Sequence, residues 1–192
     1  MKIRFDDCIC HGKLIDHHII HERLLNEINS SDNEPIIQKG PGYYSTVSRA
    51  DYNHMNSFER SWVKKFIPSL FVSVEKILSQ AGYKIEGKRG VDFIDIWFHQ
   101  YLEGDTYGWH VHTHQFSGIY YLEFGKSSGK TQICSPFSFK TKKINVKEGD
   151  IVIFPSHILH RALPNKSERK TVISFNFNLT PETKLDVNLI RN

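Results

Sequence analysis

Cysteine is scarce in this 192-residue chain, which contains only Cys8, Cys10 and Cys134. Three unevenly spaced cysteines argue against the disulfide framework of a small secreted domain and favour a reducing, intracellular setting. The segment Cys8-x-Cys10-His11 lacks the second ligand pair that a zinc site of this type needs. We therefore expect free cysteines close to an N-terminal strand.

Long apolar runs are missing as well. No stretch approaches the roughly 18 to 20 apolar residues of a membrane span, and the opening MKIRFDDCICHGKLID has no apolar run of signal-peptide length. Neither sign of charge dominates, because 25 basic and 21 acidic residues give a net charge of +4. We expect a soluble cytoplasmic protein without a membrane partner. Its mildly basic balance is compatible with an acidic small molecule or a nucleic acid and demonstrates neither.

Repeats, low-complexity tracts and linkers rich in Pro, Gly or Ser are absent too. Their absence predicts a single domain over residues 1–192. A hydrophobic content of 39% and a charged content of 24% are typical of a globular chain. The 13 Phe and 8 Tyr residues suit a fold rich in β-sheet.

The first part of the chain has helical periodicity. Residues 16–29 place Ile and Leu on one helical stripe, and residues 57–80 repeat the pattern, with Pro68 expected to kink or split that helix. The stretch 40–54 (GPGYYSTVSRADYNH) is predicted to be a loop from its Gly and Pro content. We expect residues 1–90 to form mainly helical support and loop.

From about residue 91 the pattern changes to short runs rich in Val, Ile, Phe and Tyr. The predicted strands are 92–101, 118–124, 131–134, 150–154 and 170–179. Helices first and many short strands afterwards favour an α+β domain. Its β-half, residues 91–180, would be a sandwich or barrel.

Three histidines stand at alternate positions in GDTYGWHVHTHQFSGIYYLEF, residues 104–124. On a strand, His110, His112 and His114 would face one side, and imidazole is the commonest protein ligand for transition metals. Same-face neighbours lie about 6.6 Å apart, so two imidazoles can converge on one ion, whereas the third, about 13 Å from the first, cannot easily join them. The spacing leaves two pairs open, His110 with His112 or His112 with His114. A polar strand edge without a metal is the alternative.

A further ligand must come from another element. His160, in FPSHILHRALPN, follows the apolar run IVIF and is expected on the next strand of the same sheet, whereas His157 lies in a Pro-Ser loop that favours exposure. Arg169 precedes the strand KTVISFNFNL, where it could bind a carboxylate with a two-pronged ion pair. Thr171 would face the same side. For Lys170 we expect a surface charge.

Further motifs accompany these histidines. Tyr101, Gly104, Tyr107 and His110 form a spaced series, and the chain continues with HVHTHQFSGIYY, EGDIVIFPSHILHRALPN and RKTVISFN. In these residues the second half resembles the iron(II)/2-oxoglutarate-dependent oxygenases, and within them the prolyl-hydroxylase-like branch and its small relatives. The resemblance covers residues 90–180 well and the N-terminal part thinly.

This resemblance implies a double-stranded β-helix (a jelly roll, cupin-like) with supporting N-terminal helices. It implies Fe(II) as the metal, with molecular oxygen and 2-oxoglutarate as co-substrates, in a dioxygenase that hydroxylates an unidentified substrate and releases succinate and CO2. The metal ligands that it selects are His110, His112 and His160. It leaves His114 an outer or exposed role. The residues implied to contact the 2-oxoglutarate carboxylate are Arg169, Thr171 and Tyr107.

One position departs from the family pattern, because His112 stands where most such oxygenases have Asp or Glu. A neutral ligand leaves a ferrous centre one positive charge higher, which bears on oxygen activation and metal preference. Two other functions therefore stay open: a cupin-like three-His dioxygenase or isomerase that does not use 2-oxoglutarate, and a non-catalytic binding protein on the same scaffold. The substrate is unspecified; a protein side chain or a small molecule is favoured, and nucleic acid is not excluded.

Overall fold

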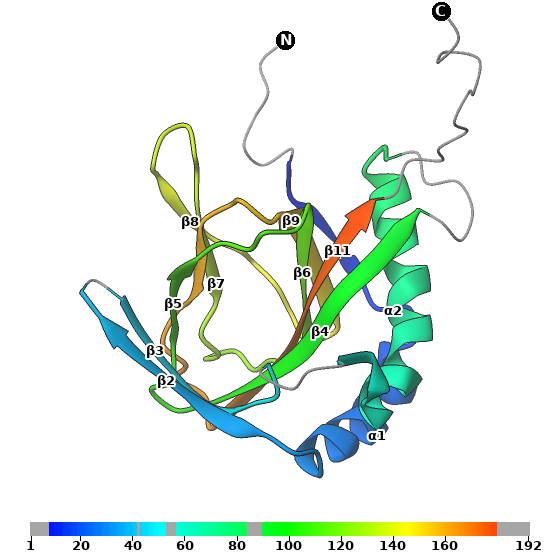
Figure 1. The fold of residues 1–192 in the computed structure, drawn as a ribbon, viewed down its shortest axis with the longest axis horizontal. Coiled ribbons are helices and arrows are strands. Elements are labelled where there is room, and N and C mark those ends of the chain that lie inside the picture. The colour runs from blue at the N-terminus through cyan, green and yellow to red at the C-terminus, as the bar shows by residue number, and fades with distance from the viewer. Residues whose placement is uncertain (1–7, 42, 53–56, 84–89, 180–192) are drawn as a thin grey trace, which may run out of the picture.

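Two antiparallel sheets face each other in this protein (Figure 1). A computed structural model describes residues 8–41, 43–52, 57–83 and 90–179. The main sheet has seven strands in the order β1-β9-β6-β11-β4-β3-β2, and the small sheet has four in the order β5-β10-β7-β8. The strands are β1 Cys10–Lys13, β2 Glu34–Gly40, β3 Tyr43–Ala50, β4 Val91–Leu102, β5 Tyr107–His110, β6 Phe116–Glu123, β7 Thr131–Cys134, β8 Thr141–Lys143, β9 Asp150–Pro155, β10 His160–Ala162 and β11 Arg169–Leu179.

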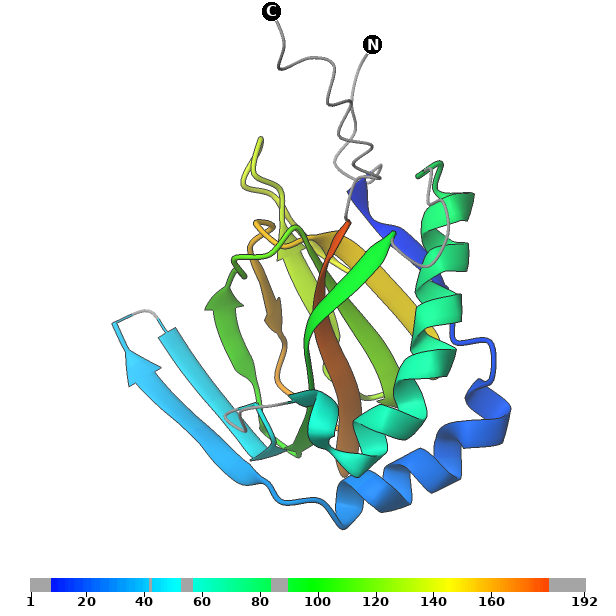
Figure 2. The same cartoon turned by 45° about the vertical axis from the view of Figure 1, so that its right-hand side comes forward.

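Two helices cover the outer face of the main sheet, away from the small sheet (Figure 2). They are α1 (His17–Asn29) and α2 (Ser61–Gln80), the latter preceded by a short 3-10 turn, η2 (Ser57–Glu59). Helix α2 continues through Pro68, so of the kink or split expected there the split does not occur. It ends just before Gly82, whose φ of +90° suits a glycine after a helix C-terminus. No helix in the described part of the chain is long and apolar enough to cross a membrane.

The main sheet is buried on both faces, since alternate side chains of a strand point to opposite sides. On β6, Tyr120 belongs to the core beneath the helices, whereas Tyr121 belongs to the core between the two sheets. On β11, Ile173, Phe175 and Phe177 pack under the helices. The even-numbered residues of β11 therefore face the space between the sheets, which is where the candidate site lies.

The expected fold class, an α+β jelly roll with supporting helices, is confirmed. Both predicted helices and all five predicted strands are present within a few residues of the expected ends. The loop predicted over 40–54 is wrong, because Tyr43–Ala50 forms β3, which pairs with β2 and β4 and buries Val47 and Ala50. Two strands, β2 and β3, thus come from a region expected to be helix and loop, whereas β1 agrees with the N-terminal strand expected beside the cysteines. The three cysteines are free, and Cys10 begins β1.

Candidate active site

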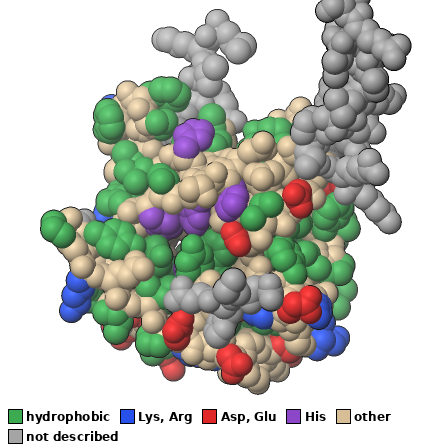
Figure 3. Space-filling view, viewed as in Figure 1, with side chains coloured by type: hydrophobic (Ala, Val, Ile, Leu, Met, Phe, Trp, Pro, Cys, Tyr) green, Lys and Arg blue, Asp and Glu red, His purple; other side chains and the backbone are tan. Residues whose placement is uncertain are grey.

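A cavity of about 170 Å³ opens between the two sheets. In Figure 3, histidine side chains gather around a hollow on this face of the molecule. Among the described residues that line the cavity there is no Asp or Glu, although several are basic or imidazole-bearing. The polar lining includes His99, Tyr107, His110, His112, His160 and Lys170.

Three of these histidines converge. His110 ends β5 and His160 begins β10, and the two are direct partners across the small sheet. His112 follows two residues after β5, and its ring centroid lies 5.1 Å from that of His110 and 5.2 Å from that of His160. One ring nitrogen from each of the three lies within 4.8 Å of the other two, which is a spacing that could hold one metal ion.

The local backbone differs from what the alternation suggested. Strand β5 ends at His110, so the three alternate histidines do not share one strand. The N–H of His112 instead donates to the carbonyl of Ser156, at 3.0 Å, which holds this turn against the end of β9. From the order of the runs, His160 was expected in the same sheet as the IVIF strand, β9. This was wrong, because His160 lies in the small sheet beside His110. The grouping of the three ligands is thus produced by two sheets rather than by one.

The ring orientations of this group suit a metal. The Nδ1 atoms of His110 and His160 each lie 2.8 Å from a backbone carbonyl, that of Gly108 and of Ile158, so each Nδ1 donates its proton and the Nε2 lone pair is left for a ligand. Burial lowers the pKa of His110, lowers that of His160 well below its ordinary value, and lowers that of His112 to about 4. Neutral imidazole is the form that binds a metal, so protons do not compete at neutral pH.

The two remaining candidates lie outside this group. His114 Nε2 is 3.3 Å from the Asp95 carboxylate, and His114 is not among the converging ligand atoms. His157 is exposed, as its Pro-Ser loop suggested.

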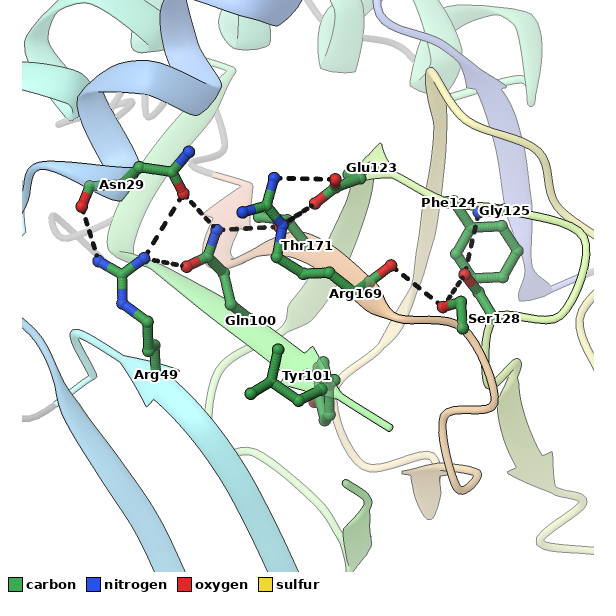
Figure 4. Close-up of polar contacts among 12 residues, drawn as sticks. Asn29, Arg49, Gln100, Tyr101, Glu123, Phe124, Gly125, Ser128, Arg169 and Thr171 are labelled. Carbon is green, nitrogen blue, oxygen red and sulfur yellow. Dashed lines mark hydrogen bonds and ion pairs between the residues drawn. The ribbon is translucent and has the colours of Figure 1, made fainter. Parts of the chain in front are cut away.

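Arg169 and Thr171 do not line the cavity. Arg169 forms a two-pronged pair with Glu123 on β6, with N–O distances of 2.8 and 3.0 Å, and Thr171 Oγ1 donates to the same carboxylate at 2.8 Å. Figure 4 shows this network continuing through Gln100 to Arg49. The structure therefore places both side chains on the outer side of β11, away from the three histidines. The carboxylate that Arg169 binds there belongs to Glu123 of the protein itself and not to a ligand.

Lys170 occupies the position that was expected for Arg169. It is 2% exposed and lines the cavity, so its expected role as a surface charge is wrong. Its Nζ donates to the carbonyl of Gly129 at 3.0 Å and lies 3.8 Å from the centre of the Tyr101 ring. No carboxylate pairs with it in the described part of the chain, and burial lowers its pKa to about 7. A buried amine without a counter-ion, facing a cavity, suits an anionic ligand.

Other polar groups that the sequence did not single out also face this cavity. The Nε2 of His99 and the Nε1 of Trp97 are buried without a hydrogen-bond partner in the described structure. Tyr107, which was expected at the site, lines the cavity and stacks on His99 with ring centroids 5.3 Å apart. Burial lowers the pKa of His99 to about 3, so this imidazole is neutral. Buried polar atoms with no partner are rare in proteins and point to a bound molecule that satisfies them.

The alternation along β11 was the signal that could have found Lys170. Large apolar residues at 173, 175 and 177 mark the face packed under the helices, and the opposite parity contains 170. His99 and Trp97 had no comparable signal, because most residues of β4 are large or apolar on both faces.

Comparisons with known proteins agree with this geometry. Residues 95–178 match the family model described as "Putative 2OG-Fe(II) oxygenase", while no curated protein matches the chain. Among solved structures, a 2OG-Fe(II) oxygenase family oxidoreductase from Burkholderia pseudomallei is similar, with a TM-score of 0.68, 10% identity and coverage of 88% of this chain and 84% of that one.

Two prolyl hydroxylases are similar as well. One is a Pseudomonas putida prolyl-4-hydroxylase, with a TM-score of 0.60, 13% identity and coverage of 88% of this chain and 91% of that one. The other is a Trichoplax adhaerens prolyl hydroxylase in complex with a hypoxia inducible factor peptide fragment, with a TM-score of 0.62, 15% identity and coverage of 89% and 84%. These identities show a shared fold, and the matched family segment contains all three histidines and Lys170. Over residues 95–178 the chain is therefore similar to the 2OG-Fe(II) oxygenases, and it shares the fold of the solved structures of that class.

Proposed function

We propose that this protein is an Fe(II)/2-oxoglutarate-dependent dioxygenase that binds iron through His110, His112 and His160 and binds 2-oxoglutarate through Lys170. The observation that carries the proposal is the placement of three converging, neutral imidazoles and one buried, unpaired amine around the same cavity. The first group suits a transition metal and the second suits the carboxylate of an acidic co-substrate.

The three histidines fit a ferrous ion. Imidazole nitrogen is a common ligand of iron, and the backbone carbonyls of Gly108 and Ile158 fix two of the rings in the tautomer that presents Nε2. The amide of Asn176 lies 3.3 Å from His112 Nδ1 and orients the third ring. A set of three imidazoles leaves positions on a six-coordinate metal for 2-oxoglutarate and oxygen.

The cavity also fits 2-oxoglutarate. Its described lining lacks acidic residues, so a dicarboxylate meets no like charge there. An ammonium group has three donors, and the Gly129 carbonyl takes one of those of Lys170. We assign the far carboxylate of 2-oxoglutarate to the remaining donors. Tyr107 and the unpartnered Nε2 of His99 line the same space and are the next candidates to contact it.

When bound, the metal and co-substrate would couple oxidative decarboxylation of 2-oxoglutarate, to succinate and CO2, to hydroxylation of a second substrate. The protein's own residues hold the metal, orient the co-substrate and keep water out. The relative from Trichoplax is described in complex with a peptide fragment, which supports a protein side chain as the substrate here; a small molecule is the other candidate.

His112 distinguishes this site from one with a carboxylate ligand. With neutral ligands only, the bound cation keeps its full double charge, which strengthens its attraction for a dicarboxylate and weakens the electron donation it receives. This difference is the reason to keep a second function in view, that of a three-His metal enzyme that does not use 2-oxoglutarate.

The proposal is tested by comparing two neighbouring substitutions. Protein reconstituted with Fe(II) without oxygen is titrated with 2-oxoglutarate by calorimetry, and succinate is then measured after oxygen is added. Removing one partner of a buried charge pair costs 2 kcal/mol or more, so Lys170→Met should weaken 2-oxoglutarate binding by roughly 30-fold or more. Arg169→Met should bind within a few-fold of the unmodified protein, because Arg169 lies on the other face of the sheet.

Three outcomes decide between the functions. Succinate formation above that of a His110→Ala control, lost in Lys170→Met and kept in Arg169→Met, supports the proposal. Loss of 2-oxoglutarate binding in Arg169→Met alone would show that the anchor is misassigned. Iron binding without any 2-oxoglutarate binding or succinate would favour the three-His enzyme that does not use this co-substrate, and no bound iron would favour a non-catalytic binding protein.

A further inference from the structure

A second group of metal-binding side chains lies on the opposite face of the main sheet from the cavity. His17 and His21 are one helical turn apart on α1, so their imidazoles lie on the same face of the helix. Glu148 reaches them from the turn that precedes β9. The nearest ligand atoms of these three side chains all lie within 4.8 Å of one another.

The distances are close to those of a metal site. Glu148 Oε1 is 3.8 Å from His17 Nε2 and 3.7 Å from His21 Nε2. Atoms bound tetrahedrally at about 2.1 Å from a zinc ion are roughly 3.4 Å apart. Movements of a few tenths of an ångström would therefore bring the carboxylate oxygen and each imidazole to bonding distance. None of these contacts is short enough for a hydrogen bond.

Contacts behind the group hold each ligand in place. His17 Nδ1 is 2.7 Å from the hydroxyl of the buried Tyr120, which leaves Nε2 for the metal. The other oxygen of Glu148 accepts the N–H of Phe124 at 2.9 Å, which points Oε1 toward the histidines. Partners of this kind orient ligands in known metal sites.

The turn itself is shaped for a close approach to α1. Gly149 has a φ of +85°, and a Cβ there would lie 3.0 Å from the His17 ring. The Gly149 carbonyl accepts the N–H of Leu14 and the Gly149 N–H donates to Tyr121.

An independent observation points to a missing partner. The Nε2 of His21 is buried and has no hydrogen-bond partner among the described residues, although it faces the Glu148 carboxylate. The charge of Lys13, a cation near His17, is offset by Asp150, 3.5 Å away. Two imidazole nitrogens and a carboxylate oxygen therefore meet at ion-pair distance, 3.7 and 3.8 Å, and no hydrogen bond joins them.

We propose that His17, His21 and Glu148 form a second metal site, selective for Zn(II) or a similar borderline cation, which ties helix α1 to the turn before β9. Two nitrogen ligands and one carboxylate oxygen are a common zinc set, with water in the fourth position. The site shares no residue with the cavity, so it does not depend on the function proposed above. Because the metal would bind the folded state and not the separated elements, it would stabilise the packing of α1.

The test counts zinc ions in a protein whose cavity site has been removed. The double variant His110→Ala/His160→Ala is dialysed against Zn(II), analysed for bound metal, and titrated in competition with a chelator. We expect one bound equivalent. Adding His21→Ala or Glu148→Gln should weaken that binding by at least tenfold, since even outer partners of metal ligands contribute ten- to a hundredfold. Adding His18→Ala should leave it unchanged, because His18 is an exposed neighbour outside the group.

A bound equivalent that survives both His21→Ala and Glu148→Gln would overturn the site, and so would a double variant that binds no zinc. If the substitutions impair folding, as circular dichroism would reveal, crystals of the unmodified protein soaked in Zn(II) decide the question. An anomalous peak between α1 and the turn at Glu148 supports the site, and its absence contradicts it. If the unmodified protein binds one equivalent of zinc that His21→Ala removes and His110→Ala/His160→Ala retains, the second site stands and the cavity does not bind zinc.

Discussion

Lys170 and Arg169 are adjacent on β11, yet their side chains lie on opposite faces of the main sheet. Lys170 Nζ is buried in the cavity beside Tyr101, whereas Arg169 pairs with Glu123 on the outer side. The cavity therefore receives an amine with a pKa of about 7 instead of a permanently charged guanidinium. This difference gives the proposed co-substrate site a dependence on pH that an arginine anchor would lack.

The affinity for 2-oxoglutarate should fall as the pH rises above 7. Below its pKa Lys170 is an ammonium ion and pairs with a carboxylate directly, whereas above it the amine must first take up a proton. The dissociation constant should rise about tenfold per pH unit above 7 until the pKa of the complex is reached. Titrations at pH 6.5, 7.5 and 8.5 measure this. Lys170→Met serves as the control and should bind weakly at each pH without this trend; a trend that persists in it would contradict the assignment.

Iron binding should distinguish His114 from the other three histidines. His110→Ala, His112→Ala and His160→Ala each remove one of the converging ligand atoms and should abolish tight iron binding. His114→Ala should bind iron within a few-fold of the unmodified protein, because His114 pairs with Asp95 outside the group. Anaerobic iron titrations of the four variants check this. If His114→Ala lost the metal while His110→Ala kept it, the ligand assignment would be wrong.

Much of this architecture was predictable from the sequence. The change of period near residue 91 predicted a sandwich or barrel of strands. The family resemblance of the motifs around His110 and His160 implied the jelly roll and the three candidate ligands. The strands β2 and β3 were not predicted, because Gly and Pro at 40–42 indicated a loop. Gly40 instead ends β2 and pairs with Tyr43 at the start of β3, and the polar sequence that follows is held as a strand by pairing with β4. Such pairing depends on distant residues and leaves little local signal.

The site was less predictable than the fold. Alternation along β11 separates its even-numbered residues from its odd-numbered ones. It assigns Lys170 to the cavity only once the face covered by the helices is known. Arg169, which was expected to bind the co-substrate carboxylate, does form a two-pronged ion pair, but on the face of the main sheet opposite the cavity. His21 and Glu148 are 127 residues apart in the chain, and only the docking of α1 against the turn before β9 brings them together.

The metal-free protein should lose stability steeply in mild acid. The pKa of His99 is about 3 in the folded state and close to 6.5 when unfolded, so between these values the unfolded state binds more protons. The stabilising contribution is therefore complete above pH 6.5 and is lost as the pH falls toward 3. It amounts to about 1.4 kcal/mol per pH unit. Urea unfolding at pH 6, 5 and 4 should show a shallower fall in the free energy of unfolding for His99→Gln, by about this amount per unit. Equal slopes would contradict a neutral, buried His99.

Gly118, the glycine of the SGIYY motif, should not tolerate a side chain. A Cβ at this position on β6 would lie 2.1 Å from the ring of Phe175, which is fully buried under the helices. Since Phe175 is packed against Phe93 and Phe177, it has little room to move. Gly118→Ala should lower the free energy of unfolding by about 1–3 kcal/mol or more, as overpacked cores do.

The matched control for this substitution is Gly125→Ala. The nearest atom to a Cβ at Gly125 is the Ser128 hydroxyl at 3.8 Å, an ordinary contact. That variant should change stability by less than about 0.5 kcal/mol. Urea unfolding of both variants at pH 7 gives the comparison. A Gly118→Ala protein as stable as Gly125→Ala would show that the Phe175 ring can move aside. Core packing would then not be the reason for a glycine at this position, which also lines the cavity.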